Sequence, residues 1–438
     1  MTWRERAALV AVLSAMALVV LDAGMLNVAL PVIAGALGDT PAKVTLTITA
    51  YQTALVIGML PCAQIAERIG YRRLFIAGIS TFLAASILCA LAPSLLILVA
   101  ARIVQGLGGA AIMALGIALL RFALGSGRLG AAIGWNALTV ALCTALAPIL
   151  GAAILSAASW PWLFLVKLPL GVAALVAAAF LPEVAPTRVS VDRAAILLHG
   201  MVAMLVLSAV QTVISWPGAA AALSAAAIAA SAMLVRRQRA SPAPLWPTDL
   251  FVIRPLRIAV IASVCCFVGQ SGGFLALPFY VQLGLGGSAA QTALVLTCWP
   301  LAVAVVGPFA NGFSQRFGSA ILCTVGAITT SAGLLLAALW PVGESLWPLA
   351  ISASLGGIGF GLFQVPNNRT IFLAAPPARS AAAGGVQGSA RLTGQTFGAL
   401  LVGVLLALLP PAEAARSALG VASFFSLLAA LVSAVASP

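Results

Sequence analysis

The chain has 438 residues, of which 63% are hydrophobic and only 7% are charged, and its mean hydropathy is +1.16. A soluble domain carries about 25% charged residues, so this composition excludes a soluble protein. The formal net charge of +13 would suit a nucleic-acid partner if the basic residues formed one patch.

Apolar runs of about twenty residues recur along the chain, and this pattern is typical of membrane-spanning helices. The sequence therefore predicts an all-α membrane protein with fourteen transmembrane helices. In chain order, the predicted spans are approximately 8–33, 46–66, 74–94, 96–120, 130–156, 160–182, 194–215, 217–235, 255–283, 289–313, 319–340, 346–369, 383–409 and 415–436.

Most of the arginines lie in alternate loops between these runs, whereas the intervening loops "LAPSL", "WPG" and "LGLGGSAAQ" contain none. Positive residues on one side of the membrane indicate the cytoplasmic side, so the N-terminus is expected in the cytoplasm. An even number of spans returns the C-terminus to the same side. Membrane topology thus explains the basic charge, and we expect the lipid bilayer and no nucleic acid as a partner.

Short sequence matches indicate an internal repeat. "ALP" occurs at 29–31 and 276–278, "LGG" at 107–109 and 355–357, and "ERIG" at 67–70 matches "QRFG" at 315–318, with offsets of 247, 248 and 248 residues. Two six-helix halves, 1–185 and 241–438, fit this spacing, with an inserted helix pair at 186–240. Duplicated halves that meet at a central site are characteristic of secondary transporters.

The repeated segments also resemble the major facilitator superfamily, and within it the fourteen-span drug:proton antiporter branch. "LDAGMLNVALPVI" is similar to the first-helix signature of that branch, "AQIAERIGYRR" to the loop motif between helices 2 and 3, and "RIVQGLGGA" to the fourth-helix motif. "APILGAAILSAASWPWLFLVKLPLG" resembles the antiporter motif of helix 5 and the segment that follows it. The resemblance implies the major facilitator fold and multidrug efflux, although Lys167 and Leu46 stand where the family has Asn and Trp.

Asp22 is the carboxylate that lies deep inside a predicted span. It is nine residues, about 13 Å, from the outer end of its helix near Pro31, and Arg102 is seven residues, about 10 Å, from the outer end of helix 4. The similar depths predict that the two side chains interact, directly or through water and Gln105. This pair is either a switch that gains and loses a proton or a permanent salt bridge that ties helices 1 and 4 together.

The resemblance assigns two further sets of residues. Glu67, Arg68, Gly70 and Arg72 of the first-half loop, with Arg316 of the matching loop, would form a cytoplasmic gate. Pro148 and Gly151 belong to the antiporter motif, which in the family goes with exporters. Pro148 lacks an N–H and favours a kink, and its small neighbours let another helix approach closely.

A substrate cavity is predicted from polar and aromatic side chains inside the spans. Interhelical hydrogen bonds and lipid contacts are the alternative roles for them. The candidates are Asn27, Tyr51, Trp135, Gln270, Tyr280, Phe363, Gln364 and Arg391.

The function expected from these residues is proton-coupled export of small lipophilic compounds by alternating access, with protons and the small-molecule substrate as partners. Cationic compounds are favoured because one deep carboxylate suits one positive charge. A proton-coupled symporter for uptake of a metabolite is the alternative, and a membrane enzyme or sensor is a third class. The sequence shows no phosphate-binding loop, metal-ligand cluster or Ser/His/Asp set, so we expect no enzyme, cofactor or metal. A monomer in a bacterial inner membrane is expected.

Overall fold

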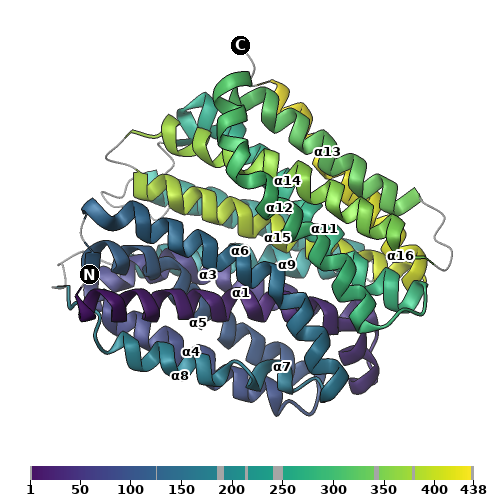
Figure 1. Ribbon diagram of the computed structural model, residues 1–438, viewed down its shortest axis with the longest axis horizontal. Coiled ribbons are helices and arrows are strands. Elements are labelled where there is room, and N and C mark those ends of the chain that lie inside the picture. The colour runs from purple at the N-terminus through teal and green to yellow at the C-terminus, as the bar shows by residue number, and fades with distance from the viewer. Residues whose placement is uncertain are drawn as a thin grey trace. The chain divides into compact units, whose positions relative to one another are not determined.

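The computed structural model describes residues 2–124, 126–184, 192–212, 216–239, 250–339, 345–376 and 380–435, which form helices joined by short loops (Figure 1). The first part contains α1 (Trp3–Leu37), α2 (Pro41–Val44), α3 (Leu46–Ile69), α4 (Tyr71–Ala90), α5 (Leu95–Leu124), α6 (Ser126–Ala157), α7 (Trp162–Leu165), α8 (Leu168–Ala178), α9 (Arg193–Thr212) and α10 (Pro217–Arg239). The second contains η1 (Leu250–Val252), α11 (Arg254–Phe279), η2 (Tyr280–Gly284), α12 (Ala289–Phe317), α13 (Ser319–Leu339), α14 (Trp347–Ala374), α15 (Ser380–Leu408) and α16 (Pro411–Ala434).

The expected all-helical membrane architecture is confirmed for the described residues. Twelve helices are long and apolar enough to cross a membrane. Shorter apolar helices at 162–178 and 193–206 fall where two further spans are predicted, so the count of fourteen stays a prediction. Helices suit a bilayer because the backbone N–H and C=O groups form hydrogen bonds within the helix, and apolar side chains face the lipid.

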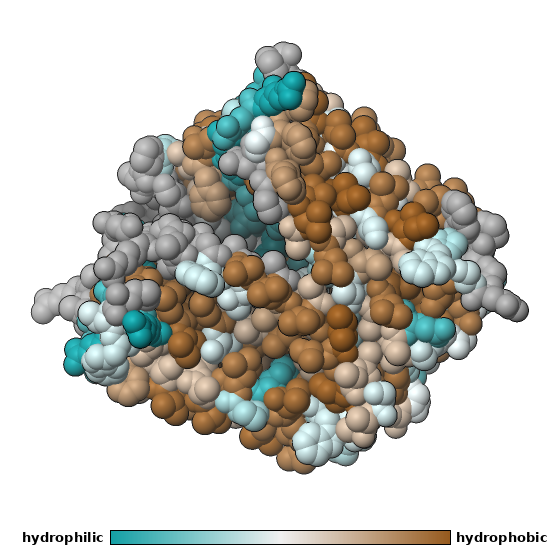
Figure 2. Space-filling view, in the orientation of Figure 1, coloured by the Kyte–Doolittle hydropathy of each residue, from teal (hydrophilic) through white to brown (hydrophobic). Residues whose placement is uncertain are grey.

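Apolar side chains cover most of the face shown in Figure 2. Large hydrophobic residues are among the most exposed, including Leu96 at 79%, Trp347 at 75% and Leu294 at 68%. In water, so extended an apolar surface would drive association, whereas in a bilayer it faces lipid chains.

The chain divides into two compact units. Unit 1 comprises residues 1–26 and 47–245, and unit 2 comprises 27–46 and 246–438. The first part of α1 therefore packs in unit 1, and its last part packs in unit 2, where Gln282 donates a hydrogen bond of 3.0 Å to the carbonyl of Val28.

The α9–α10 pair packs within unit 1. Near the start of α9, the Arg237 guanidinium donates hydrogen bonds of 2.8–3.1 Å to the Asp192 carboxylate, and this hydrogen bonding lowers the pKa of Asp192.

Backbone geometry repeats with the spacing expected from the sequence. Glycines with a positive φ occur at Gly38 (+66°) and Gly286 (+68°), and at Gly70 (+101°) and Gly318 (+88°). The members of each pair are 248 residues apart. An L side chain rarely adopts this conformation, which explains why the turns after the first helix and before the third helix of each repeat use glycine.

Candidate functional site

A buried charged cluster lies within unit 1, centred on Asp22 of α1, which is 1% exposed. Arg102 of α5 donates to Asp22 Oδ2, and Lys167, between α7 and α8, donates to Asp22 Oδ1. Gln105 Nε2 also donates to Oδ1, at 3.0 Å. The contact between Asp22 and Arg102 that their similar depth predicts is therefore present and direct.

Arg102 is held from several directions and is fully buried. Its Nε donates to the Thr47 carbonyl at 3.1 Å, its Nη1 also donates to Gln105, and its Cζ lies 4.0 Å from the centroid of the Tyr51 ring. A guanidinium over an aromatic face is attracted by the ring quadrupole. Tyr51, expected to line a cavity, instead packs against Arg102 with 2% exposure.

The sequence predicts Asp22, Arg102 and Gln105 as one site, which does not include Lys167. Lys167 is 4% exposed, and its ammonium lies 5.2 Å from the centroid of the Phe164 ring. The sequence signal was available, because a lysine stands there in an apolar segment where the resembling family has Asn. Depth counting along continuous helices could not place it, since α7 ends at Leu165 and α8 begins at Leu168.

The charges of the cluster add up to one net positive charge when all three groups are ionised: Asp22 contributes −1, and Arg102 and Lys167 contribute +1 each. The sequence-based prediction pairs Asp22 with Arg102 alone and on that basis favours a cationic substrate. With two cations on it and 1% exposure, Asp22 is already compensated in this structure.

The antiporter-motif residues lie where α6 meets α1. Pro148 is inside α6 and buried, and a Cβ atom at Gly151 would lie 3.0 Å from the Met25 carbonyl oxygen. On the facing side, a Cβ atom at Gly24 would lie 2.5 Å from the Cβ of Ala147. The close helix approach expected from the small residues is therefore present, two residues along α1 from Asp22.

We expect Gly24→Ala to lower the melting temperature of the purified protein, because the added methyl group must push α1 from α6 at a cost of about 1–3 kcal/mol. Gly35→Ala, in the same helix, is the matched control, since nothing lies within 4 Å of a Cβ atom there. Thermal unfolding followed by tryptophan fluorescence compares the two variants. Equal melting temperatures would show that the α1–α6 contact is loose.

The residues of the predicted gate are at helix ends. Gly70 caps α4, and Arg72 Nη1 forms an ion pair of 3.2 Å with Glu183 Oε1. Arg68 and Arg316 are exposed, and Glu67 is half-buried. Their role as a gate stays a prediction.

The predicted cavity residues do not share one environment. Tyr280 and Phe363, both residues of unit 2, are buried at 4% and 0% exposure, and their role in a substrate cavity stays a prediction. Trp135 is 56% exposed. The remaining candidates, all half-buried, are Asn27, Gln270, Gln364 and Arg391.

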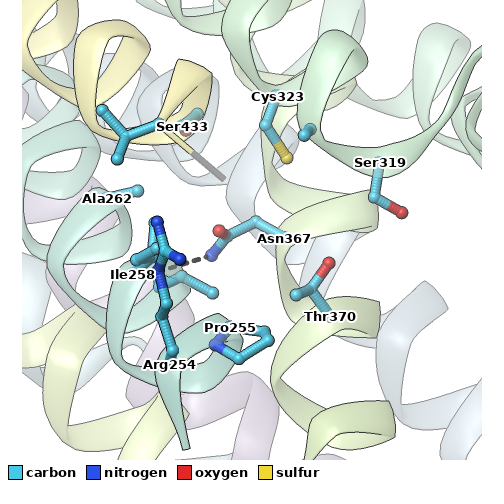
Figure 3. Close-up of a pocket in the computed structure, with 12 residues that line it drawn as sticks. Arg254, Pro255, Ile258, Ala262, Ser319, Cys323, Asn367, Thr370 and Ser433 are labelled. Carbon is cyan, nitrogen blue, oxygen red and sulfur yellow. Dashed lines mark hydrogen bonds between the residues drawn. The ribbon is translucent and has the colours of Figure 1, made fainter. Parts of the chain in front are cut away.

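A separate cavity of about 330 Å³ lies in unit 2 between α11, α13, α14 and α16 (Figure 3). Asn367 on its wall donates to the Ala259 carbonyl at 3.2 Å and to Ser263 Oγ at 2.7 Å. Arg254, the first residue of α11, is its charged lining residue. Since the predicted cavity residues are absent from its described lining, it is a different site from the expected one.

Comparison with known proteins gives close relatives for nearly the whole chain. It is 38% identical over 414 residues to the uncharacterized transporter YebQ of Escherichia coli (strain K12), covering 91% of this chain and 88% of that protein. It is 27% identical to the riboflavin transporter RibZ of Clostridioides difficile (strain 630), covering 82% and 78%. It is 28% identical to the tetracenomycin C resistance and export protein of Streptomyces glaucescens, covering 91% and 75%.

A solved structure has the same fold: a POT family transporter in complex with 5-aminolevulinic acid aligns with a TM-score of 0.74 at 15% identity, over 99% of this chain and 95% of that one. The family model described as Major Facilitator Superfamily matches residues 12–258 and 259–438. The repeat, the helices and these matches agree, and the chain is a transporter that belongs to the major facilitator superfamily.

Proposed function

We propose that this transporter exports small amphiphilic compounds in exchange for protons, and that the protons are exchanged at the Asp22–Lys167 pair. The observation that carries the proposal is the cluster itself: three ionisable side chains, each at most 4% exposed, within a membrane-spanning unit. An intramembrane ionisable residue is functional by default, because burying it without a purpose would only weaken the fold. A relative named as a resistance and export protein supports the direction of transport.

The charge balance of the cluster favours exchange of one proton. Fully ionised, it holds a net charge of +1, which burial disfavours. Loss of one proton from Lys167 leaves the neutral Asp22–Arg102 pair. Arginine keeps its proton in proteins, whereas a buried lysine gives its proton up readily, so Lys167 is the exchangeable cation.

Alternating access would couple this exchange to transport. Opening of the cluster to one side admits water and a proton, and opening to the other side releases it. The cytoplasmic side would be closed by loop residues, namely Glu67, Arg68, Gly70, Arg72 and Arg316. The small residues of the Pro148–Gly151 segment would let α6 stay in close contact with α1 during this change. We place the protein in a bacterial inner membrane, with both termini cytoplasmic, as a monomer.

Uptake with protons is the second candidate, because the relatives also include a riboflavin transporter. The chemistry of the cluster serves either direction. Only the coupling sign distinguishes them: protons move against the substrate in export and with it in uptake.

The test uses inverted membrane vesicles that contain the protein and are energised to an inside-acid gradient. Dansylglycine, dansylcadaverine and dansylamide carry one fluorophore with a negative, positive and neutral side group, and each is added in turn. Export predicts uptake of a probe into the vesicles together with proton release from them, both abolished by a protonophore. Accumulation that survives the protonophore would contradict proton coupling, and probe movement out of the vesicles with protons would establish the uptake alternative.

A further inference from the structure

Helix α15 of unit 2 carries a polar stripe, which we define as Gln387, Arg391 and Gln395. The three residues are four positions apart, so they lie on one face of the helix. All three are half-buried. The surrounding sequence, "GGVQGSARLTGQTFG", otherwise consists of small, hydroxyl and apolar residues.

The face of α15 that carries the polar stripe packs against α11. A Cβ atom at Gly398, which is seven positions beyond Arg391 and on the same face, would lie 2.6 Å from the Val268 carbonyl oxygen of α11. Ser271 Oγ of α11 donates to the Gln395 carbonyl at 3.0 Å. Arg391 is the twelfth residue of α15, about 16 Å along the helix from its first residue, which places it near the middle of a membrane span.

The Nε atom of the half-buried Arg391 is itself buried and has no hydrogen-bond partner in the part of the chain that the structure describes. None of the ion pairs among the described residues includes Arg391. Arg102 provides the contrast, since it donates to Asp22, Gln105 and the Thr47 carbonyl. Buried polar atoms are normally hydrogen-bonded, so the unpaired Nε of Arg391 is an open position for an acceptor that a ligand can supply.

The neighbouring helices of unit 2 have no carboxylate that could accept a hydrogen bond from Arg391. α11, α12, α13, α14 and α15 contain no Asp or Glu. Glu413 lies in the first turn of α16, and Asp39 pairs with Lys43 at 3.2 Å. The repeat gives no partner either, because the residue 248 positions before Arg391 is Cys143.

The ionised groups deep in the spans therefore sum to a positive charge in each unit: +1 in the Asp22 cluster of unit 1 and +1 at Arg391 in unit 2. Such a protein repels an organic cation at these positions and attracts an anion. The deep carboxylate that suggested cationic substrates is already paired with Arg102 and Lys167.

We propose that the polar stripe of α15 binds the anionic group of an amphiphilic substrate, a carboxylate or sulfonate, with the Arg391 guanidinium as its counter-ion. The Gln387 and Gln395 amides, one turn to each side, supply further N–H donors. A guanidinium binds a carboxylate or sulfonate through two parallel N–H bonds. This proposal rests on the proposed transport function and names its substrate class.

The test measures binding to the purified full-length protein in detergent, with no proton gradient. Dansylglycine and dansylcadaverine share one fluorophore and differ in charge, so the ratio of their dissociation constants reports the charge preference. We expect the wild-type protein to bind dansylglycine at least about tenfold more tightly, as a charge-assisted hydrogen bond predicts. Arg391→Gln is expected to abolish the preference, and Arg391→Lys to keep part of it.

Arg416→Gln is the matched control, because Arg416 is also in unit 2 but donates to the Ala338 carbonyl at 3.1 Å. It should keep the preference for the anion. Equal affinity for the two probes, including no binding of either, would overturn the proposal, as would a preference that survives Arg391→Gln. Binding is read without a gradient, so failure of proton coupling in vesicles leaves this result standing, and the reverse also holds.

A second measurement separates ligand binding from a structural role. A buried guanidinium nitrogen without a partner costs stability, and methionine keeps the apolar packing of the arginine stem, so Arg391→Met should melt at or above the wild-type temperature. A melting temperature lowered by several degrees would show that Arg391 holds the helices together and would overturn the proposal.

Discussion

Replacing Asp22 by Asn is expected to destabilise the protein strongly, whereas replacing Lys167 by Asn is expected to leave its stability nearly unchanged. Asp22→Asn leaves Arg102 and Lys167, both buried, without their shared anion, so the cluster either carries +2 or holds a neutral Lys167 beside an unpaired Arg102. Removing one partner from a buried ion pair costs about 3–5 kcal/mol. Lys167→Asn lowers the cluster charge to zero and keeps the Arg102–Asp22 pair.

The double variant Asp22→Asn/Lys167→Asn sharpens this comparison. It returns the cluster charge to +1, so it should recover about half of the stability lost in Asp22→Asn, although it contains one substitution more. Thermal unfolding in detergent, with the yield of monodisperse protein as a second readout, ranks the four proteins. If Asp22→Asn melts with the wild type, the carboxylate does not hold the two cations in place.

This ranking also affects how transport assays are interpreted. A transport defect in Asp22→Asn alone does not distinguish loss of the proton carrier from loss of the folded protein. The Lys167 variants, which are expected to be stable, are therefore the better probes of coupling. Lys167 became a target for substitution because the structure places it in the cluster.

The sequence was sufficient for the Asp22–Arg102 contact because both residues lie on continuous helices. Helical rise converts residue counts into depth, and two opposite charges at similar depth in an apolar interior are stabilised when they pair. The repeat was likewise visible, since the turns at Gly70 and Gly318 need a backbone conformation that only glycine adopts freely.

The sequence was insufficient where the chain leaves regular helix or where packing decides exposure. Lys167 lies in the break between α7 and α8, and there residue counting gives no direction for its side chain. Tyr51, Tyr280 and Phe363 were candidates for a cavity by residue type, and each is at most 4% exposed. Burial depends on neighbours brought together by the fold, which no local pattern encodes.

Replacing Lys167 by Arg is expected to abolish proton coupling while leaving the fold and substrate binding intact. Arginine preserves the positive charge and can pair with Asp22, so the cluster keeps its net charge of +1. It does not release its proton at any working pH, because the guanidinium stays charged in proteins. If Lys167 carries the exchanged proton, the variant should lose gradient-driven accumulation of the dansyl probe by at least about tenfold, with unchanged probe affinity in detergent.

Lys167→Asn tests the same step from the opposite side, since it fixes the cluster in its deprotonated charge state. Both variants should be uncoupled if the cluster charge must alternate between +1 and 0. Each variant must first be shown to melt near the wild-type temperature, in particular Lys167→Arg, because arginine is larger than lysine. Coupling that survives in Lys167→Arg and fails in Lys167→Asn would assign the exchanged proton to Asp22. Coupling that survives in both would identify the cluster as a structural tie between α1, α5 and the α7–α8 break, and the proton path would then have to run through other residues.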